Sequence, residues 1–295
     1  GGKVVLWSDV HNTNSVTNAY GTIYAKGGVN GGDGGRVETS GRQLEVDGGW
    51  VDASSVSGHG GEWLLDPYNI IISGNNSNNV TGSDPYTSAN SSSNINVSVI
   101  TGALNSGTSV TVQTGSGGSE IGDLQVNTAI TKTGGGDATL TLKAHNNVVV
   151  SNAISSSSSK LHINLIADTD KDGAGVVITN SNLTTNGGNL AFGDGSIISF
   201  GGANTLVGGD VYVQGSSTVT WTTAGGSVTV NGQTLIGNSQ GLSVDSNGGT
   251  VTFNGSIDSA NQYTSVNVAC GITWERALAA AKTGTGDATG DTSLA

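Results

Sequence analysis

From about residue 95 to residue 270, the chain repeats one local pattern, in which short β-branched and aliphatic runs are separated by Gly, Asn and Ser. Within a run, apolar residues alternate with Thr, Ser or Asn, as in Thr139–Leu142 and Leu161–Leu165. This alternation predicts strands that bury one face. In the last third of the chain the runs begin at residues 211, 219, 228, 242, 251 and 266, with weaker runs at Leu235–Ile236 and Ser256–Ile257 between them.

The spacing of these runs predicts how the strands are arranged. Three units of about 7–9 residues make roughly 20–25 residues, which suits one turn of a parallel β-helix, whose strands stack on their counterparts one turn away. We therefore predict an all-β fold, a parallel β-helix (solenoid), in which Val97–Ile100 is one of the strands. A β-propeller or stacked immunoglobulin-like modules would also have short strands. The latter would need longer strands, a recurring buried Trp and more than the two Pro residues present.

Composition agrees with a solenoid and disfavours other classes. The 49 Gly residues suit sharp corners that require positive φ, and outward Thr and Ser suit a flat sheet. Charged residues are 11% of the chain, against about 25% in an average domain, so the chain lacks the high charge of disordered sequences. Long helices are not expected, because helix-forming residues gather only near the C-terminus.

Changes in composition divide the chain into four segments. The first segment, residues 1–72, contains Trp7, Trp50 and Trp63. The second, residues 73–94, is rich in Asn and Ser and should form a polar loop, and the third, residues 95–270, is the β-helix itself. The last contains a predicted helix at 274–282, which Thr273 can cap and whose first turn holds Glu275. The segments are residues 1–72, 73–94, 95–270 and 271–295.

A second polar stretch, Ser155–Ser159, is expected to be a loop or a corner of the solenoid. The run Gly31–Gly35 lacks the Lys-Ser/Thr of a phosphate-binding loop, and tight turns account for it better.

Four motifs of the N-terminal segment resemble the filamentous-haemagglutinin-like exoproteins of two-partner secretion systems: Gly2–Asp9, Gly21–Gly28, Gly34–Gly41 and Gly61–Ile70. The resemblance is clear over residues 1–72 and one of style over 95–270. It implies a right-handed parallel β-helix that forms the stalk of a secreted adhesin on the surface of a Gram-negative bacterium.

The same resemblance implies partners. The full-length parent would leave the cell through an outer-membrane secretion pore and would attach to glycans or proteins of host or bacterial surfaces. The family's N-terminal secretion domain, with its Asn-Pro-Asn-Gly signature, is missing from this sequence, so we expect the chain to be a fragment of a longer protein. Residues 272–295 faintly resemble the opening helix of a C-type-lectin-like domain.

Charge and hydropathy restrict the partners further. The net charge is −12 and no Lys/Arg cluster is present, which argues against a nucleic-acid partner. No run of about 18 apolar residues is present, so no membrane span is expected. Cys270 is the only cysteine, which excludes an internal disulfide, and we expect it to be a small buried side chain.

One motif has the spacing of a calcium-binding loop. Asp168, Asp170, Asp172 and Gly173 follow the pattern D-x-D-x-D-G, in which alternate carboxylates converge on one cation. Thr179 occupies the twelfth position, where such loops carry a bidentate Glu. A polar corner in which Asp caps the turn explains the motif as well. We expect no cofactor, with calcium as the open alternative.

We do not expect an enzyme. A glycosidase needs two facing carboxylates, and the candidates are scattered beside Gly or Asn, as turn residues are. These candidates are Asp168, Asp172, Asp194, Asp210 and Asp245. A carbohydrate-active or carbohydrate-binding β-helix protein is the alternative to an adhesin. An enzyme would bring at least two carboxylates and a cation together in one groove, whereas a stalk would have its charged residues dispersed over the corners.

The remaining candidates for chemistry have simpler structural explanations. No two of the four histidines, His11, His59, His145 and His162, have metal-ligand spacing. The three N-terminal tryptophans could stack on sugars, but core or cap positions are more usual in a Gly-rich β fold. Thr-x-Thr pairs lack the constant spacing of an ice-binding surface, and strand propensity explains them. These pairs are Thr139/Thr141, Thr218/Thr220 and Thr250/Thr252.

Overall fold

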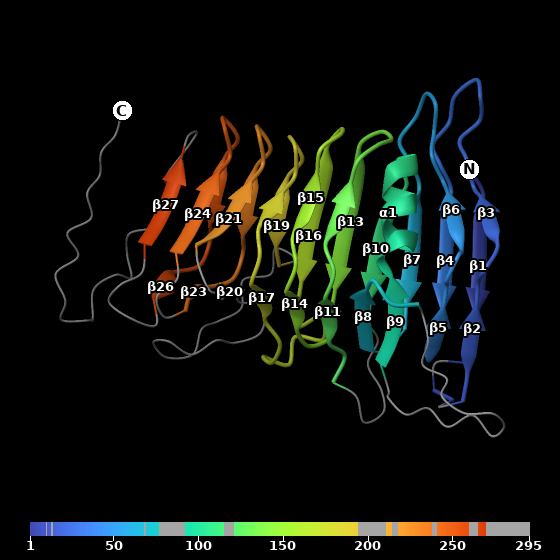
Figure 1. The fold of residues 1–295 in the computed structure, drawn as a ribbon, viewed down its shortest axis with the longest axis horizontal. Coiled ribbons are helices and arrows are strands. Elements are labelled where there is room, and N and C mark those ends of the chain that lie inside the picture. The colour runs from blue at the N-terminus through green and yellow to red at the C-terminus, as the bar shows by residue number, and fades with distance from the viewer. Residues whose placement is uncertain are drawn as a thin grey trace.

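The chain forms a parallel β-helix, as predicted. The structure is a computed structural model that describes residues 1–9, 11–12, 14–67, 69–76, 92–114, 121–193, 211–213, 218–237, 241–259 and 265–269. All strand pairs in these residues are parallel, and each strand pairs mainly with strands one turn before and after it. Figure 1 shows the resulting stack, with β1 at one end and β27 at the other.

The strands form three faces. Face 1 is a nine-stranded sheet, face 2 contains an eight-stranded sheet and face 3 a six-stranded sheet. In stacking order, face 1 consists of β1 (Lys3–Trp7), β4 (Arg36–Ser40), β7 (Glu62–Asp66), β10 (Ser109–Gln113), β13 (Ala138–Lys143), β16 (Leu161–Ile166), β19 (Leu190–Phe192), β22 (Val228–Val230) and β25 (Val251–Phe253).

Faces 2 and 3 begin with the short pairs β2–β5 and β3–β6, formed by Val16–Asn18 with Gln43–Glu45 and by Thr22–Tyr24 with Trp50–Asp52. Face 2 continues with β9 (Ser92–Asn96), β8 (Asn69–Ser73), β11 (Leu124–Val126), β14 (Val148–Val150), β17 (Val177–Thr179), β20 (Val211–Val213), β23 (Thr234–Ile236) and β26 (Ile257–Ser259). Face 3 continues with helix α1 (Val97–Ser106), then β12 (Ile130–Lys132), β15 (Ile154–Ser156), β18 (Leu183–Thr184), β21 (Val219–Thr222), β24 (Gly241–Asp245) and β27 (Ser265–Ala269).

The register gives the length of a turn. Thr141 of β13 lies opposite Asn164 of β16, and the two are 23 residues apart. This length falls within the interval predicted from the strand spacing. Other turns are longer, as between β19 and β22, where Asn189 and Ser227 are 38 residues apart.

The core is a column of aliphatic side chains that point inward from all three faces. The predicted alternation is seen directly in β13 and β16, whose residues are alternately buried and partly exposed. Each turn places an apolar residue on that of the turn before, for example Leu140 on Val110 and Ile163 on Leu140. Phe192 and Trp221 fill the interior of one turn, with ring centroids 4.4 Å apart.

Residues 1–72 are turns of the same solenoid. Strands β1, β4 and β7 belong to face 1, and β7 pairs directly with β10, so one ladder runs from the N-terminal segment into the region after residue 95. Strand β9 begins at Ser92, so the polar segment predicted at 73–94 is in part a strand of face 2. Residues 77–91 of that segment lie outside the described part of the chain.

The strand predicted at Val97–Ile100 is wrong, because these residues begin helix α1. The side chain of Asn96 caps the helix by accepting a hydrogen bond from the Ser98 amide at 2.9 Å. Gly107, at φ +84°, ends it. Its buried residues, Val99, Ile100, Ala103 and Leu104, recur with helical rather than strand periodicity. The short β-branched run looked like the neighbouring strands, and the period became visible only over the longer window.

Helix α1, labelled in Figure 1, takes the place of a strand on face 3. It contacts both β6 and β12. Face 2 has two strands at this level, because β9 lies between β5 and β8. The β5–β9 contact includes a hydrogen bond from the Leu44 amide to the Ser93 hydroxyl at 3.2 Å. Face 1 has only β7 between β4 and β10. The helix is about 10 Å wide, so it matches two strands rather than one.

Two further predictions concern local structure. Ser155–Ser159 is only partly a corner, because Ile154–Ser156 forms β15 and the corner follows it. The C-terminal helix predicted at 274–282, together with the whole of 271–295, lies outside the described residues.

Candidate functional site

The three aspartates of the D-x-D-x-D-G motif come together at the corner between β16 and β17, which we call the acidic corner (residues 167–176). One ligand atom from each of Asp168, Asp170 and Asp172 lies within 4.8 Å of the others. Among the described residues, no other group of three or more His, Cys, Asp or Glu side chains is so close together. Asp170 and Asp172 are exposed, whereas Asp168 is only 3% exposed.

The backbone of the acidic corner is held by the corner of the preceding turn. The Asp168 amide donates to the Asn146 carbonyl at 3.1 Å, and the Thr169 amide donates to the Ala144 carbonyl at 3.3 Å. Asp168 Oδ1 accepts a hydrogen bond from the Asp172 amide at 3.1 Å, which folds the loop back on itself. Asp168 has φ +54° and Gly173 has φ +87°, so the chain turns sharply at both ends of the motif.

A ladder of side-chain hydrogen-bond acceptors joins the acidic corner to the corners of the preceding turns. Asn69 Oδ1 accepts from the Asp123 amide at 2.8 Å, and Asp123 Oδ1 accepts from the Asn147 amide at 3.0 Å. Asn147 Oδ1 then accepts from the Val176 amide at 2.9 Å, which reaches the acidic corner. Each step joins one turn to the next, so the position of the acidic corner is determined by the whole stack rather than by its own loop.

The surroundings of the acidic corner disfavour the ionised form of Asp168. Burial, together with the neighbouring Asp170 carboxylate, raises the pKa of Asp168 to about 6. Asp168 Oδ2 is buried and has no hydrogen-bond partner among the described residues. The nearest basic group on the preceding turn is His145, whose Nδ1 lies 3.4 Å from Asp170 Oδ2.

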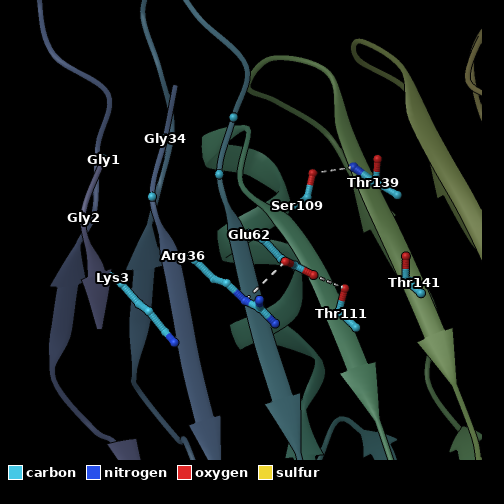
Figure 2. A pocket seen from close by; sticks show the side chains of 13 residues that line it. Gly1, Gly2, Lys3, Gly34, Arg36, Glu62, Ser109, Thr111, Thr139 and Thr141 are labelled. Carbon is cyan, nitrogen blue, oxygen red and sulfur yellow. Dashed lines mark hydrogen bonds and ion pairs between the residues drawn. The ribbon is translucent and has the colours of Figure 1, made fainter. Parts of the chain in front are cut away.

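A second candidate is a shallow groove of about 600 Å³ on the outer side of face 1. Figure 2 shows its side chains, which come from β1, β4, β7, β10 and β13. Glu62 lies at its centre, 3.7 Å from Arg36 Nε, and accepts a hydrogen bond from the Thr111 hydroxyl at 2.7 Å. The lining residues are Gly1, Gly2, Lys3, Gly34, Gly35, Arg36, Gly60, Gly61, Glu62, Ser109, Thr111, Thr139 and Thr141.

The groove owes its floor to stacked Gly pairs at the corner before face 1. A Cβ atom on Gly61 would lie 2.0 Å from the Gly35 carbonyl oxygen, and one on Gly35 would lie 2.1 Å from the Gly2 carbonyl oxygen. The Gly-Gly pairs of the sequence motifs therefore let successive backbones approach closely. This is a structural reason for the motifs, and it leaves the hydroxyl and charged side chains as the groups that a ligand would meet.

Of the carboxylates predicted as possible catalytic donors, the three that the structure describes do not all converge in one groove. Asp168 and Asp172 lie in the acidic corner, while Asp245 ends β24 on another face and accepts a hydrogen bond from the Asn247 amide. Asp194 and Asp210 lie outside the described residues. The face 1 groove holds two cations, Lys3 and Arg36, but Glu62 is the only carboxylate among its described lining residues.

Two charged residues that sequence reasoning missed have unusual environments. The pKa of Asp66 on face 1 is raised to about 6, mainly by burial and also by the Glu38 carboxylate, against an opposing effect of the Lys143 ammonium. Lys132 is fully buried at the end of β12, and burial lowers its pKa. Its Nζ donates to the Ser158 carbonyl at 2.9 Å and to the Gly134 carbonyl. Only the register could have placed these groups, since neither belongs to a recognisable motif.

The tryptophans have different environments. Trp63 is a core residue, as predicted, and its indole N–H donates to the Thr39 hydroxyl at 3.1 Å. Trp7 and Trp50 are not core residues, because they are 69% and 42% exposed on β1 and β6, and of the two predicted positions, core or cap, only the core is excluded for them. Trp50 forms an edge-to-face pair with the exposed Tyr24, 6.4 Å between ring centroids. Stacking of a sugar on these rings stays a prediction.

The histidines are dispersed. His162 points outward, as expected if its neighbours are buried, and its Nδ1 accepts a hydrogen bond from the Asn189 amide at 3.0 Å. His59 lies beside Asp33, and His11 is exposed near the N-terminus. Cys270 lies outside the described residues.

The comparisons with protein-family models and with curated proteins gave no match to the chain. Within the described residues, no helix has the length and apolar character that a membrane span requires.

Proposed function

We propose that the chain is a segment of the shaft of a secreted bacterial surface adhesin, which supports attachment to host cells or other surfaces. The observation that carries this proposal is the unbroken ladder of nine parallel strands along face 1. Such a ladder makes a long, stiff body from local contacts between neighbouring turns, which suits a part that holds a binding module away from the cell.

The resemblance of residues 1–72 to filamentous-haemagglutinin-like exoproteins supports the same function. In this proposal the full-length parent is exported through an outer-membrane pore and acts at the cell surface. The net charge of −12 would keep neighbouring shafts apart and soluble. The three clustered aspartates, Asp168, Asp170 and Asp172, lie at a corner, which is where polar groups are expected in a shaft.

Labelling of intact cells tests this proposal. An antibody raised against the 295-residue chain should label intact cells of the producing bacterium, and deletion of the encoding gene should reduce attachment to epithelial cells or to glass. Labelling that requires permeabilised cells would contradict a surface function. So would unchanged attachment of the deletion strain on every surface tested.

A carbohydrate-binding role is the second candidate, and the face 1 groove favours it. The groove combines a row of hydroxyls, from Ser109, Thr111 and Thr139, with the cations of Lys3 and Arg36. Such a lining suits an acidic glycan that lies along the stack. A glycan array probed with the chain and with Arg36→Ala would test this role, with Lys160→Ala, an exposed residue elsewhere, as the control. Binding that Arg36→Ala leaves unchanged would exclude the groove.

A further inference from the structure

We propose that the acidic corner binds a calcium ion through the carboxylates of Asp168, Asp170 and Asp172. The site is independent of the proposed function, since it depends only on the geometry of residues 167–176 and on their contact with the preceding turn. It would make this corner an ion-dependent clamp within the solenoid.

The acidic corner carries a net negative charge. Three carboxylate oxygens lie within 4.8 Å of one another, which is an unfavourable arrangement of like charges unless a cation lies among them. His145 of the preceding turn has its Nδ1 3.4 Å from Asp170 Oδ2. The loop's own cation is Lys171, between Asp170 and Asp172 in the sequence, so the three carboxylates still outnumber it, and a divalent cation among them would relieve their mutual repulsion.

Asp168 has a buried carboxylate oxygen without a hydrogen-bond partner among the described residues. Its side chain is almost completely buried, yet Oδ2 has no hydrogen-bond partner among the described residues. A buried carboxylate oxygen without a partner is costly, and such groups are usually paired or bound to a metal. Oδ1 is already used by the Asp172 amide, so Oδ2 is the free ligand atom of this residue.

The donor set points to calcium rather than to another metal. All three side chains offer carboxylate oxygens, which hard cations prefer. Asp170 and Asp172 are exposed, so water can complete the six to eight ligands that calcium accepts. Magnesium requires near-ideal octahedral geometry and gives up its water ligands reluctantly, so we expect it to bind here more weakly than calcium. His145 would orient the Asp170 carboxylate from the outer shell.

The expected affinity is low. Thr179, at the twelfth position, is fully buried on β17 and belongs to the interior of the solenoid, so the loop lacks the bidentate carboxylate that tightens such sites. Three carboxylates without that ligand predict a Kd of roughly 10⁻⁴–10⁻³ M, which is the range of extracellular calcium modules. Binding would join the end of β16 to the loop that leads into β17.

Calorimetric titration of the 295-residue chain with CaCl₂ tests the site, with MgCl₂ and ZnCl₂ as parallel titrations. Asp168→Asn keeps the Oδ1 acceptor for the Asp172 amide, so the fold should tolerate it. The double variant Asp170→Asn/Asp172→Asn replaces the two exposed carboxylates with neutral amides, which are weaker ligands and remove two of the three negative charges. Asp245→Asn is the matched control, because it makes the same charge change at a different corner. Circular dichroism of each variant verifies the fold.

We expect one calcium ion per chain, at least tenfold weaker binding in both acidic-corner variants, and unchanged binding in the control. Preference for calcium over magnesium and zinc is part of the expectation. The proposal is overturned by an absence of calcium binding at millimolar concentrations, by a preference for zinc or magnesium, or by an equal loss of affinity in the control variant.

Discussion

The stacked Gly pairs of face 1 lead to a sharp prediction about Gly61. A Cβ atom there would lie 2.0 Å from the Gly35 carbonyl oxygen and 2.7 Å from the Gly34 carbonyl carbon, distances that real Cβ atoms essentially never show. Every nearby atom belongs to backbone, so no flexible side chain can move aside. Gly61→Ala must therefore displace β7 from β4 by about an ångström.

The cost of this displacement follows from the ladder. The Glu62 amide donates to the Gly35 carbonyl at 3.0 Å, and a shift of that size removes this hydrogen bond. Leaving a buried backbone group unpaired costs about 1–3 kcal/mol. Forcing extra volume into a close-packed site costs about 1–3 kcal/mol more. Together these predict that the free energy of unfolding falls by about 2–6 kcal/mol, or roughly 10 °C in Tm for a chain of this size.

Gly136→Ala is the matched control. A Cβ atom on Gly136 would meet nothing within 4 Å, so this variant should be neutral or stabilised by about 0.4–1 kcal/mol through the loss of unfolded-state entropy. Thermal and urea unfolding followed by far-ultraviolet circular dichroism measure both variants. If Gly61→Ala melts within about 2 °C of the unmodified chain, or if Gly136→Ala loses as much stability, the close-approach explanation of the Gly pairs is wrong.

Three further predictions concern buried groups. The pKa of Asp66 is raised to about 6, so its charged form destabilises the fold above that pH. Asp66→Asn should therefore raise the free energy of unfolding by up to about 3 kcal/mol at pH 7.5 and change it little at pH 4. Urea unfolding of the variant and the unmodified chain at the two pH values measures this difference. Lys132→Ala should cost about 2–4 kcal/mol, since carbonyls at the corner lose their buried donor, and a thermal shift of under 1 °C would refute that role. Trp63→Phe should cost about 1 kcal/mol more than Trp221→Phe in urea unfolding, because Trp63 donates a hydrogen bond to Thr39 whereas the Trp221 N–H is unpaired among the described residues; equal costs would contradict this reading.

Local periodicity made most of the fold predictable. Strands such as β13 and β16 were visible because each buries every second residue, and the turn length followed from their spacing. Helix α1 was missed because Val97–Ile100 is β-branched, and only the buried positions up to Leu104 disclose its period. Propensity over four residues was overridden by the cap at Asn96 and by burial over ten.

The candidate site was predictable only in part. The spacing of Asp168, Asp170 and Asp172 within one loop was enough to place their carboxylates together. The burial of Asp168 and the approach of His145 depend on the corner of the preceding turn, and the register that aligns two turns is not encoded in either loop alone. The face 1 groove was not predictable for the same reason, since its lining residues come from five strands.

The uneven level around helix α1 has a mechanical consequence. At this level face 1 has the single strand β7, face 2 has the two strands β8 and β9, and face 3 has helix α1. Face 1 is therefore shorter along the stack by one strand spacing, or about 4.8 Å. Such a wedge tilts the turns on its two sides relative to one another, so we expect the rod to change direction there. Tension along the rod would then concentrate at the β5–β9 contact, where a bond to a serine side chain replaces a backbone ladder, and this is where the first opening under load is expected.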